Sequence, residues 1–343
     1  MSRSCRAKSI RRSLALALFA GATAPFAAGA DLSATNEPAW PQFVLRAESV
    51  IPLNLPGQRL DASGLLLTRA GALLTVNDRG GAVYQILLRT NPASGELVRL
   101  TNCFTEGRFA SLAPGPAAQL DGEGLAQDDQ GRLYLCEEAN RWILRCERAS
   151  GRLERLPIDW LPVTNYFSAD RNASFEGLAV GDGRLYVANE RSAPVILAVD
   201  LASLQVVDHF VVIPQKASLF GTHYSDLAWW DHRLFVLCRQ HQVVLEVEPR
   251  TRTVLAEYDY AEAENQLGYG TFGVMGLMEG LAVDRDHFWL VIDNNGLPRQ
   301  GTRNDTRPVL LKCPRPGADA KPERPPGRQA PVARPRSPSR LAP

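Results

Sequence analysis

The sequence lacks the signatures of several common kinds of site. It has no Gly-x-Ser-x-Gly elbow, so it does not indicate the nucleophile of an α/β-hydrolase. Beyond the first thirty residues it has no apolar run long enough to cross a bilayer. It holds five histidines and six cysteines, and the cysteine spacings fit no zinc-binding pattern. Serine nucleophile catalysis, a structural zinc site and a membrane span in the mature chain are therefore not indicated.

Acidic residues outnumber basic residues in the body of the chain, although the formal net charge of the whole chain is +1. Residues 1–30 hold five Lys or Arg and no acid, and residues 314–343 hold seven Lys or Arg against two acids. The remaining segment, 31–313, has 26 basic and 35 acidic residues. An acidic body argues against nucleic acid and favours a cation or a neutral partner. We therefore expect no nucleic-acid partner.

The two ends of the chain differ in composition from the body. Residues 1–30 place five basic residues before the apolar run 13–28 and end on small residues, which is typical of a cleaved export signal. We expect cleavage near Ala30, a periplasmic or secreted mature protein, and a linker over 31–41. Residues 314–343 contain nine prolines and almost no large apolar side chain. That composition predicts a disordered tail.

One segment recurs along the body. Residues 174–191, SFEGLAVGDGRLYVANER, consist of an acidic residue, Gly-Leu, two short β-like runs around a Gly/Asp turn, and a charged end. Four more copies have their marker leucines 60, 53, 49 and 54 residues apart; the five leucines are Leu65, Leu125, Leu178, Leu227 and Leu281. These spacings lie near the repeat length of β-propeller blades.

The repeats predict an all-β fold, a β-propeller over residues 42–313. Four of them continue with third and fourth β-like runs, which gives the four strands of a blade. The fifth repeat ends with a third run at 309–313, and the N-terminal run 42–53 has no repeat of its own. We predict five four-stranded blades, with the N-terminal strand closing the last blade and removing its open edge. Six blades are the alternative if segments 103–119 or 258–275 conceal strands.

Export would leave five cysteines in the mature chain, which is an odd number. Cys136 and Cys146 flank a predicted turn and face each other if the turn closes a hairpin. The alternatives are a disulfide between these two residues in an oxidising compartment and thiols packed as small hydrophobic groups.

The propeller geometry predicts a site at one mouth of the central channel. The start of the first strand of each blade and the end of the second meet there, which gathers acidic side chains around a narrow axis. Such carboxylates repel one another unless protons, arginines or a metal compensate, and oxygen ligands suit Ca²⁺. We predict an axial calcium held by some of Glu123, Glu176, Asp226 and Glu279. Capping of strand ends by these acids is the alternative.

The same mouth supplies candidate ligand-binding residues: Asp78, Arg79, Glu190, Arg191, His223, Arg239 and Asp293. The arginines would allow the mouth to hold an anionic ligand. Plain surface ion pairs are the alternative for Asp78-Arg79 and Glu190-Arg191. His223 suits a general base, a ligand or a structural role.

These motifs resemble the phytase-like β-propellers, the families called "esterase-like activity of phytase" and "SdiA-regulated". Nearly all of 42–313 takes part, through Ser63-Gly64-Leu65, Glu123-Gly124-Leu125, Phe175-Glu176-Gly177-Leu178, Tyr224-Ser225-Asp226-Leu227 and Glu279-Gly280-Leu281. The resemblance implies an exported propeller that binds calcium. Arg239-Gln240 departs from the acidic second-strand ends of the other repeats, which argues against a fully symmetric metal ring.

Two functions are compatible with these features. The first is an exported, monomeric binding module whose mouth holds Ca²⁺ and an unidentified small molecule or protein. The second is a metal-dependent hydrolase of a phosphoester or an ester, with the cation activating water and a mouth carboxylate as general base. The fold alone does not choose between them.

Overall fold

The computed structural model describes residues 39–112, 120–269, 276–302, 304–317 and 319–323. The predicted export signal and most of the predicted tail lie outside these residues. No helix among the described residues is long and apolar enough to cross a membrane. The described chain is built mainly of strands, with two short α-helices, α1 (Glu106–Leu112) and α2 (Ala261–Asn265).

The strands follow one another in groups along the chain. They are β1 (Gln42–Val44), β2 (Ser49–Asn54), β3 (Ala62–Leu67), β4 (Leu73–Asn77), β5 (Ala82–Thr90), β6 (Ala93–Arg99), β7 (Gly122–Gln127), β8 (Leu133–Glu137), β9 (Trp142–Glu147), β10 (Arg152–Arg155), β11 (Phe175–Gly181), β12 (Arg184–Asn189), β13 (Val195–Asp200), β14 (Val206–Phe210), β15 (Tyr224–Trp230), β16 (Arg233–Cys238), β17 (Val243–Glu248), β18 (Thr253–Asp259), β19 (Met278–Val283), β20 (His287–Ile292) and β21 (Val309–Pro314). The third β-like runs of three repeats, at 142–147, 195–200 and 243–248 in the sequence, coincide with β9, β13 and β17. The fourth β-like run of the first repeat covers 97–104 in the sequence, but the corresponding strand β6 ends at Arg99.

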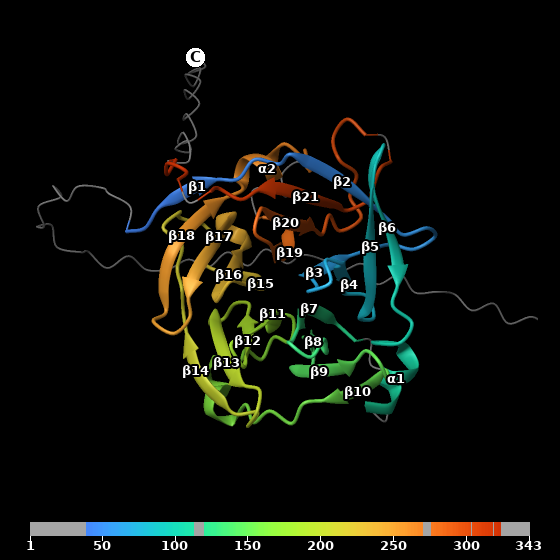
Figure 1. The fold of residues 1–343 in the computed structure, drawn as a ribbon, viewed down its shortest axis with the longest axis vertical. Helices are drawn as coiled ribbons and strands as arrows, with labels where there is room; N and C mark the ends of the chain where they lie inside the picture. The colour runs from blue at the N-terminus through green and yellow to red at the C-terminus, as the bar shows by residue number, and fades with distance from the viewer. Residues whose placement is uncertain (1–38, 113–119, 270–275, 303, 318, 324–343) are drawn as a thin grey trace, which may run out of the picture. The chain divides into compact units, whose positions relative to one another are not determined.

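The strands form antiparallel sheets in chain order. Two sheets have four strands, β7 to β10 and β11 to β14, and a third joins β15 to β18 with β1 at its edge. The eight-stranded sheet consists of two antiparallel halves, β19-β20-β21-β2 and β3-β4-β5-β6, joined by a short parallel pairing of β2 with β6. Figure 1 shows the first strand of each group near the middle and the later strands farther out.

The N-terminal run behaves differently from the prediction of one strand. It divides into β1, which pairs in parallel with β18, and β2, which pairs antiparallel with β21. The predicted pairing of an N-terminal strand with the C-terminal strand is therefore confirmed for β2. Two segments were named above as possible extra strands. The described part of 103–119 holds α1, and in the described part of 258–275 β18 ends at Asp259 and α2 follows.

The five first strands contact one another in a closed ring, from β3 through β7, β11, β15 and β19 back to β3. The repeated glycine is required by the closeness of these contacts. A Cβ on Gly124 would lie 2.5 Å from the backbone nitrogen of Leu178, and one on Gly177 would lie 2.6 Å from the Cα of Asp226. Real Cβ atoms do not approach backbone so closely, so the Gly-Leu motif reflects the packing of neighbouring first strands.

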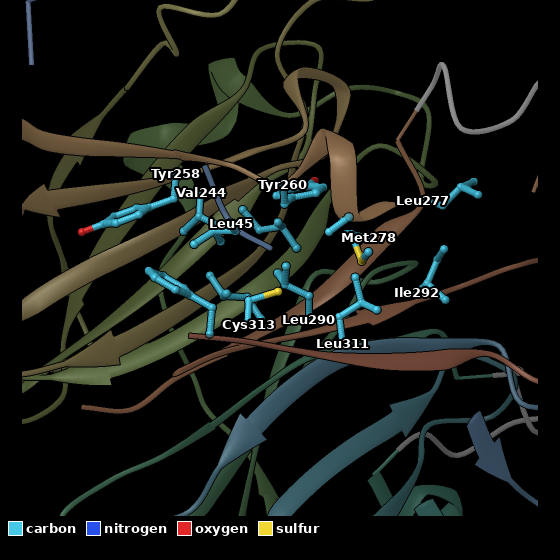
Figure 2. Close-up of a cluster of buried hydrophobic side chains, with 14 of the residues drawn as sticks. Leu45, Val244, Tyr258, Tyr260, Leu277, Met278, Leu290, Ile292, Leu311 and Cys313 are labelled. Atoms are coloured by element: carbon cyan, nitrogen blue, oxygen red, sulfur yellow. The ribbon is translucent and has the colours of Figure 1, made fainter. Parts of the chain in front are cut away.

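Hydrophobic clusters fill the spaces between neighbouring sheets. Figure 2 shows one of them, in which Val244 and Tyr258 from one sheet face Leu290 and Leu311 from the next. All four of these side chains are buried. Strands such as β8 are buried along their whole length, from Leu133 to Glu137, so both faces of a sheet supply such clusters, as expected for sheets buried on two sides.

The disulfide joins residues other than the pair considered from the sequence. Cys103, in the connection before β7, bonds to Cys146 on β9, with the two Cα atoms 6.0 Å apart. Cys136 is a free, buried thiol, as are Cys238 and Cys313. The hairpin pairing failed because Cys136 pairs with Ile143 in the strand register, whereas Cys146 lies opposite Leu133.

Candidate functional site

Strand register brings the predicted mouth residues together. The first residues of the inner strands lie opposite the last residues of the second strands, as in Gly122 opposite Glu137 and Phe175 opposite Asn189. The same pairing joins Ala62 to Asn77, Tyr224 to Cys238 and Met278 to Ile292. The expected meeting of these two strand ends is confirmed.

Each first strand has a register irregularity just before its marker leucine, and in three of the five strands an acidic residue lies there. The register shifts between the first strand residue and the glycine or leucine, which leaves Glu123, Glu176 or Glu279 outside the regular ladder. A bulge bends the strand locally and turns a side chain away from its regular direction. We call the five residues at this position the inner ring: Ser63, Glu123, Glu176, Ser225 and Glu279.

Asp226 does not belong to this ring, although it was predicted as a calcium ligand together with Glu123, Glu176 and Glu279. In β15 the residue outside the ladder is Ser225, and Asp226 takes the place that glycine has in the other repeats. Alignment of the repeats on their leucines shows the same offset, because Ser225-Asp226-Leu227 then matches Glu176-Gly177-Leu178.

Asp226 instead binds backbone N–H groups of four first strands. Its carboxylate accepts backbone N–H bonds from Leu65 at 3.0 Å, Leu281 at 2.8 Å and Leu227 at 2.8 Å. Burial raises the pKa of Asp226, and N–H bonds that include one from Leu178 act in the opposite direction. Four of the five marker leucines, on four first strands that belong to three sheets, therefore donate to one fully buried carboxylate. This is the capping role that the sequence left open.

A second set of residues follows the second strands. Four of them donate their backbone N–H to the carbonyl of the residue just before a first strand: Asp78 to Asp61, Glu138 to Asp121, Glu190 to Ser174 and Asp293 to Leu277. Arg239, directly after β16, takes the corresponding place there. We call these five residues the outer ring. Glu138 and Asp121 are not among the residues predicted from the sequence. Glu137 ends β8, and Glu138 comes one position later.

A family model described as "Phytase-like: Esterase-like activity of phytase" matches residues 61–296. The chain belongs to this family. The matched span of the phytase-like domain contains both rings of the mouth. A search of curated proteins found no match.

The phytase-like chain also resembles solved structures at low identity. Glutaminyl cyclase of Myxococcus xanthus is 14% identical, with a TM-score of 0.54 over 80% of this chain and 97% of that chain. Virginiamycin B lyase of Staphylococcus aureus is 10% identical, with a TM-score of 0.40 over 76% of this chain and 69% of that chain. The likeness to the cyclase concerns the fold alone, which is of the β-propeller type.

Carboxyl groups crowd the mouth of the phytase-like domain. Burial raises the pKa of Glu123 and of Glu176 well above the usual range. Burial and neighbouring acids also raise the pKa of Glu138 to about 7 and that of Asp293 to about 7. The pKa of Asp78 is raised to about 7 by burial and by the charges of Asp61 and other acids. Such groups remain ionised at neutral pH only if positive charge is brought to them.

Basic side chains pair with the carboxylates on one side of the mouth. Glu190 Oε1 lies 2.5 Å from Arg239 Nη2 and 3.2 Å from His223 Nδ1, and Glu190 Oε2 pairs with Arg191. Arg239 also pairs with Glu279. Burial alone would raise the pKa of Glu190, but these partners outweigh it and hold the pKa below its usual value. Five predicted site residues are thus brought into one network.

Another ion-pair group lies on the side of β3. Asp61 is buried and accepts from both Arg59 and Arg79, so one carboxylate serves two guanidinium groups. The acids Asp78 and Asp293 are close enough to interact electrostatically with Asp61. Arg79 therefore belongs to a local pair and is separate from the Glu190 network.

Two groups of oxygen ligands in the described chain are close enough to hold a cation. Asp121, Glu123 and Glu138 form one group and Glu138, Glu176 and Glu190 the other, with one ligand atom per residue and all atoms of a group within 4.8 Å of one another. Glu138 is common to both. Ser63 Oγ donates to Glu123 Oε2 at 2.5 Å, and Ser174 N donates to Glu138 Oε1 at 3.1 Å, so these carboxylates are held in place.

Aliphatic side chains make up most of the lining at the opposite end of the channel. A cavity of about 100 Å³ is lined there by the far ends of the first strands, including Leu67, Val180 and Val283. Arg69 and Gln127 also line this cavity, whereas the carboxyl groups of the two rings lie at the other ends of the first strands.

Proposed function

We propose that this phytase-like protein is an exported five-bladed propeller that binds Ca²⁺ at the acidic mouth and holds a small ligand beside it. The proposal of five blades is supported by the two halves of the eight-stranded sheet, each with four antiparallel strands, together with the other three sheets. The pairing of β2 with β21 supports closure of the last blade by the N-terminal strand. The basic and apolar pattern of residues 1–30 supports export to the periplasm or the medium.

The observation that carries the cation proposal is the place of Glu138 in both oxygen groups. Calcium takes six to eight oxygen ligands at about 2.3–2.6 Å, so two ligand atoms on opposite sides of the ion lie about 5 Å apart. The ligand atoms of each group lie within 4.8 Å of one another, which fits this size. The donors are all carboxylates, which are hard ligands and favour Ca²⁺ over soft metals.

Neighbouring charges favour one set of ligands. Glu190 already contacts two guanidinium groups, which would repel a cation bound to it. Glu279 is paired with Arg239, and Asp226 is occupied by backbone N–H groups. We therefore propose that Glu138 and Glu123 form the centre of the site, with Asp121 and Glu176 completing it.

The bound cation would neutralise carboxylates that burial otherwise keeps protonated. It would also polarise an oxygen of a ligand that reaches the mouth. Arg191, Arg239 and His223 lie on the side of Glu190 and would orient such a ligand, with Asp78, Arg79 and Asp293 on the other side.

Calorimetric titration of the purified, EDTA-treated protein with CaCl₂ tests the proposal. We expect binding together with a rise in melting temperature, and Glu138→Gln should abolish both. Glu279→Gln is the matched control, because it removes a carboxylate of the same mouth that is assigned to Arg239. Absence of Ca²⁺ binding at millimolar concentration in the wild-type protein, or unchanged binding in Glu138→Gln, would contradict the site.

A further inference from the structure

His223 is held by a buried carboxylate at the edge of the mouth. Its Nδ1 lies 3.2 Å from Glu190 Oε1, and Glu190 is fully buried. Arg239 and Arg191 engage the same carboxylate, so its orientation is fixed from both sides. The side chain of His223 is 18% exposed, so the ring is reachable from solvent.

This contact determines which ring nitrogen carries hydrogen. The charges of Arg239 and Arg191 keep Glu190 ionised, and an ionised carboxylate can only accept a hydrogen bond. Nδ1 must therefore donate, and in the neutral ring Nε2 has a free lone pair. Within the described part of the chain no hydrogen-bond partner of Nε2 is seen. A carboxylate that fixes the tautomer of an imidazole is the arrangement that prepares histidine for proton transfer.

The other histidines are placed differently. His241 uses both ring nitrogens, with Nδ1 near the carbonyl of Lys216 and Nε2 near the hydroxyl of Thr222. His232 lies on an exposed turn at the other ends of the strands and pairs with Asp182. His287 lies between Asp284 and Glu48. His209, on β14, packs against the ring of Tyr166. Among the described residues, no hydrogen bond or ion pair joins any of these four histidines to a residue of either ring.

We propose that Glu190 and His223 form a proton-transfer pair that hydrolyses a small neutral carboxylic ester at this mouth. The proposal rests on the ligand site proposed above, and Glu190 acts as the positioning residue. A neutral ester is favoured over a phosphate ester because the arginines of the mouth, Arg79, Arg191 and Arg239, are already paired with carboxylates.

The reaction needs only water and the ester. Nε2 of His223 accepts a proton from a water molecule while the water oxygen forms a bond to the carbonyl carbon. The bond from that carbon to the alkoxide oxygen then breaks, and the imidazolium returns the proton to the leaving alkoxide. The products are a carboxylic acid and an alcohol, and the imidazole is regenerated.

Hydrolysis of p-nitrophenyl acetate by the purified protein tests the proposal. His223→Ala should lower kcat/KM by about 100-fold or more, the usual contribution of a general base. Added imidazole should restore part of the rate in this variant. Glu190→Gln should lower kcat with little change in KM. His232→Gln is the control for reaction at an exposed imidazole and should leave the rate unchanged.

Several results would overturn the proposal. They are a wild-type rate no higher than that of His223→Ala, a lost rate that imidazole does not restore in folded protein, and cleavage of p-nitrophenyl phosphate in place of the acetate. Ca²⁺ titration of His223→Ala separates this failure from failure of the cation site, since binding should persist there. Independently of any substrate, ¹⁵N NMR of the ring should show hydrogen on Nδ1 at pH 8, and hydrogen on Nε2 would contradict the pair.

Discussion

Replacement of Asp226 with asparagine should strongly destabilise the protein, although the two side chains have almost the same size. The carboxylate accepts N–H bonds from Leu65, Leu227 and Leu281, and a further one from Leu178. Asparagine keeps one acceptor oxygen and turns an NH₂ group toward the remaining donors. About two buried backbone N–H groups then lose their acceptor.

The expected magnitude follows from this count. A buried donor left without a partner costs about 1–3 kcal/mol. Two such donors give a loss of about 4 kcal/mol in the free energy of unfolding, and for a chain of this size that lowers Tm by about 8 °C. Asp226→Gly would make this repeat match the other four, yet it removes every acceptor, so it should destabilise the protein at least as much.

Chemical denaturation and calorimetry of the variants provide the assay. Ser225→Ala is the matched control, because its hydroxyl makes one bond, to the carbonyl of Met278 at 3.0 Å. It should cost about 1 kcal/mol. If Asp226→Asn unfolded within 1 kcal/mol of the wild-type protein, the central role of this carboxylate would be refuted.

Three further predictions concern stability. Burial raises the pKa of Asp78 and of Asp293 to about 7 in the folded chain, against about 3.9 in the unfolded chain. The folded state therefore holds more protons than the unfolded state between about pH 4 and 7. In EDTA, the melting temperature should be higher at pH 5 than at pH 7.5. Gly177→Ala should cost about 3 kcal/mol or more in urea denaturation because its Cβ would meet Asp226, whereas Gly107→Ala, with open space around it, should be nearly neutral. Cys103→Ser should cost about 4 kcal/mol, because the bond to Cys146 spans 43 residues, and dithiothreitol should lower the wild-type melting temperature in the same way.

The repeat was readable because it reflects local requirements. Every first strand has a buried marker leucine. The glycines before four of these leucines are needed because neighbouring first strands lie very close together. The pairing of β2 with β21 could be predicted because an unpaired first run and an incomplete last repeat leave a single way to cover both edges. Sequence reasoning also found most of the mouth, since strand direction fixes which ends meet.

The errors arose where a shift of one residue or a distant contact decides the outcome. Glu137 and Glu138 are neighbours in the sequence, and only the bond from Glu138 N to the carbonyl of Asp121 shows which of them follows the strand. The choice of Cys103 as partner of Cys146 depends on how the connection before β7 folds back onto β9. Periodicity carries no information on such connections.

By itself, the sequence determined the all-β class, the repeat, the mouth and its acidic character, because these follow from patterns repeated within about fifty residues. Only the tertiary structure decided what each mouth residue does. Asp226 became a central cap, Glu138 joined two oxygen groups, and Glu190 met His223 from a neighbouring sheet 33 residues away. These roles depend on distances of a few ångströms between different sheets, which ring closure sets and which no single repeat contains.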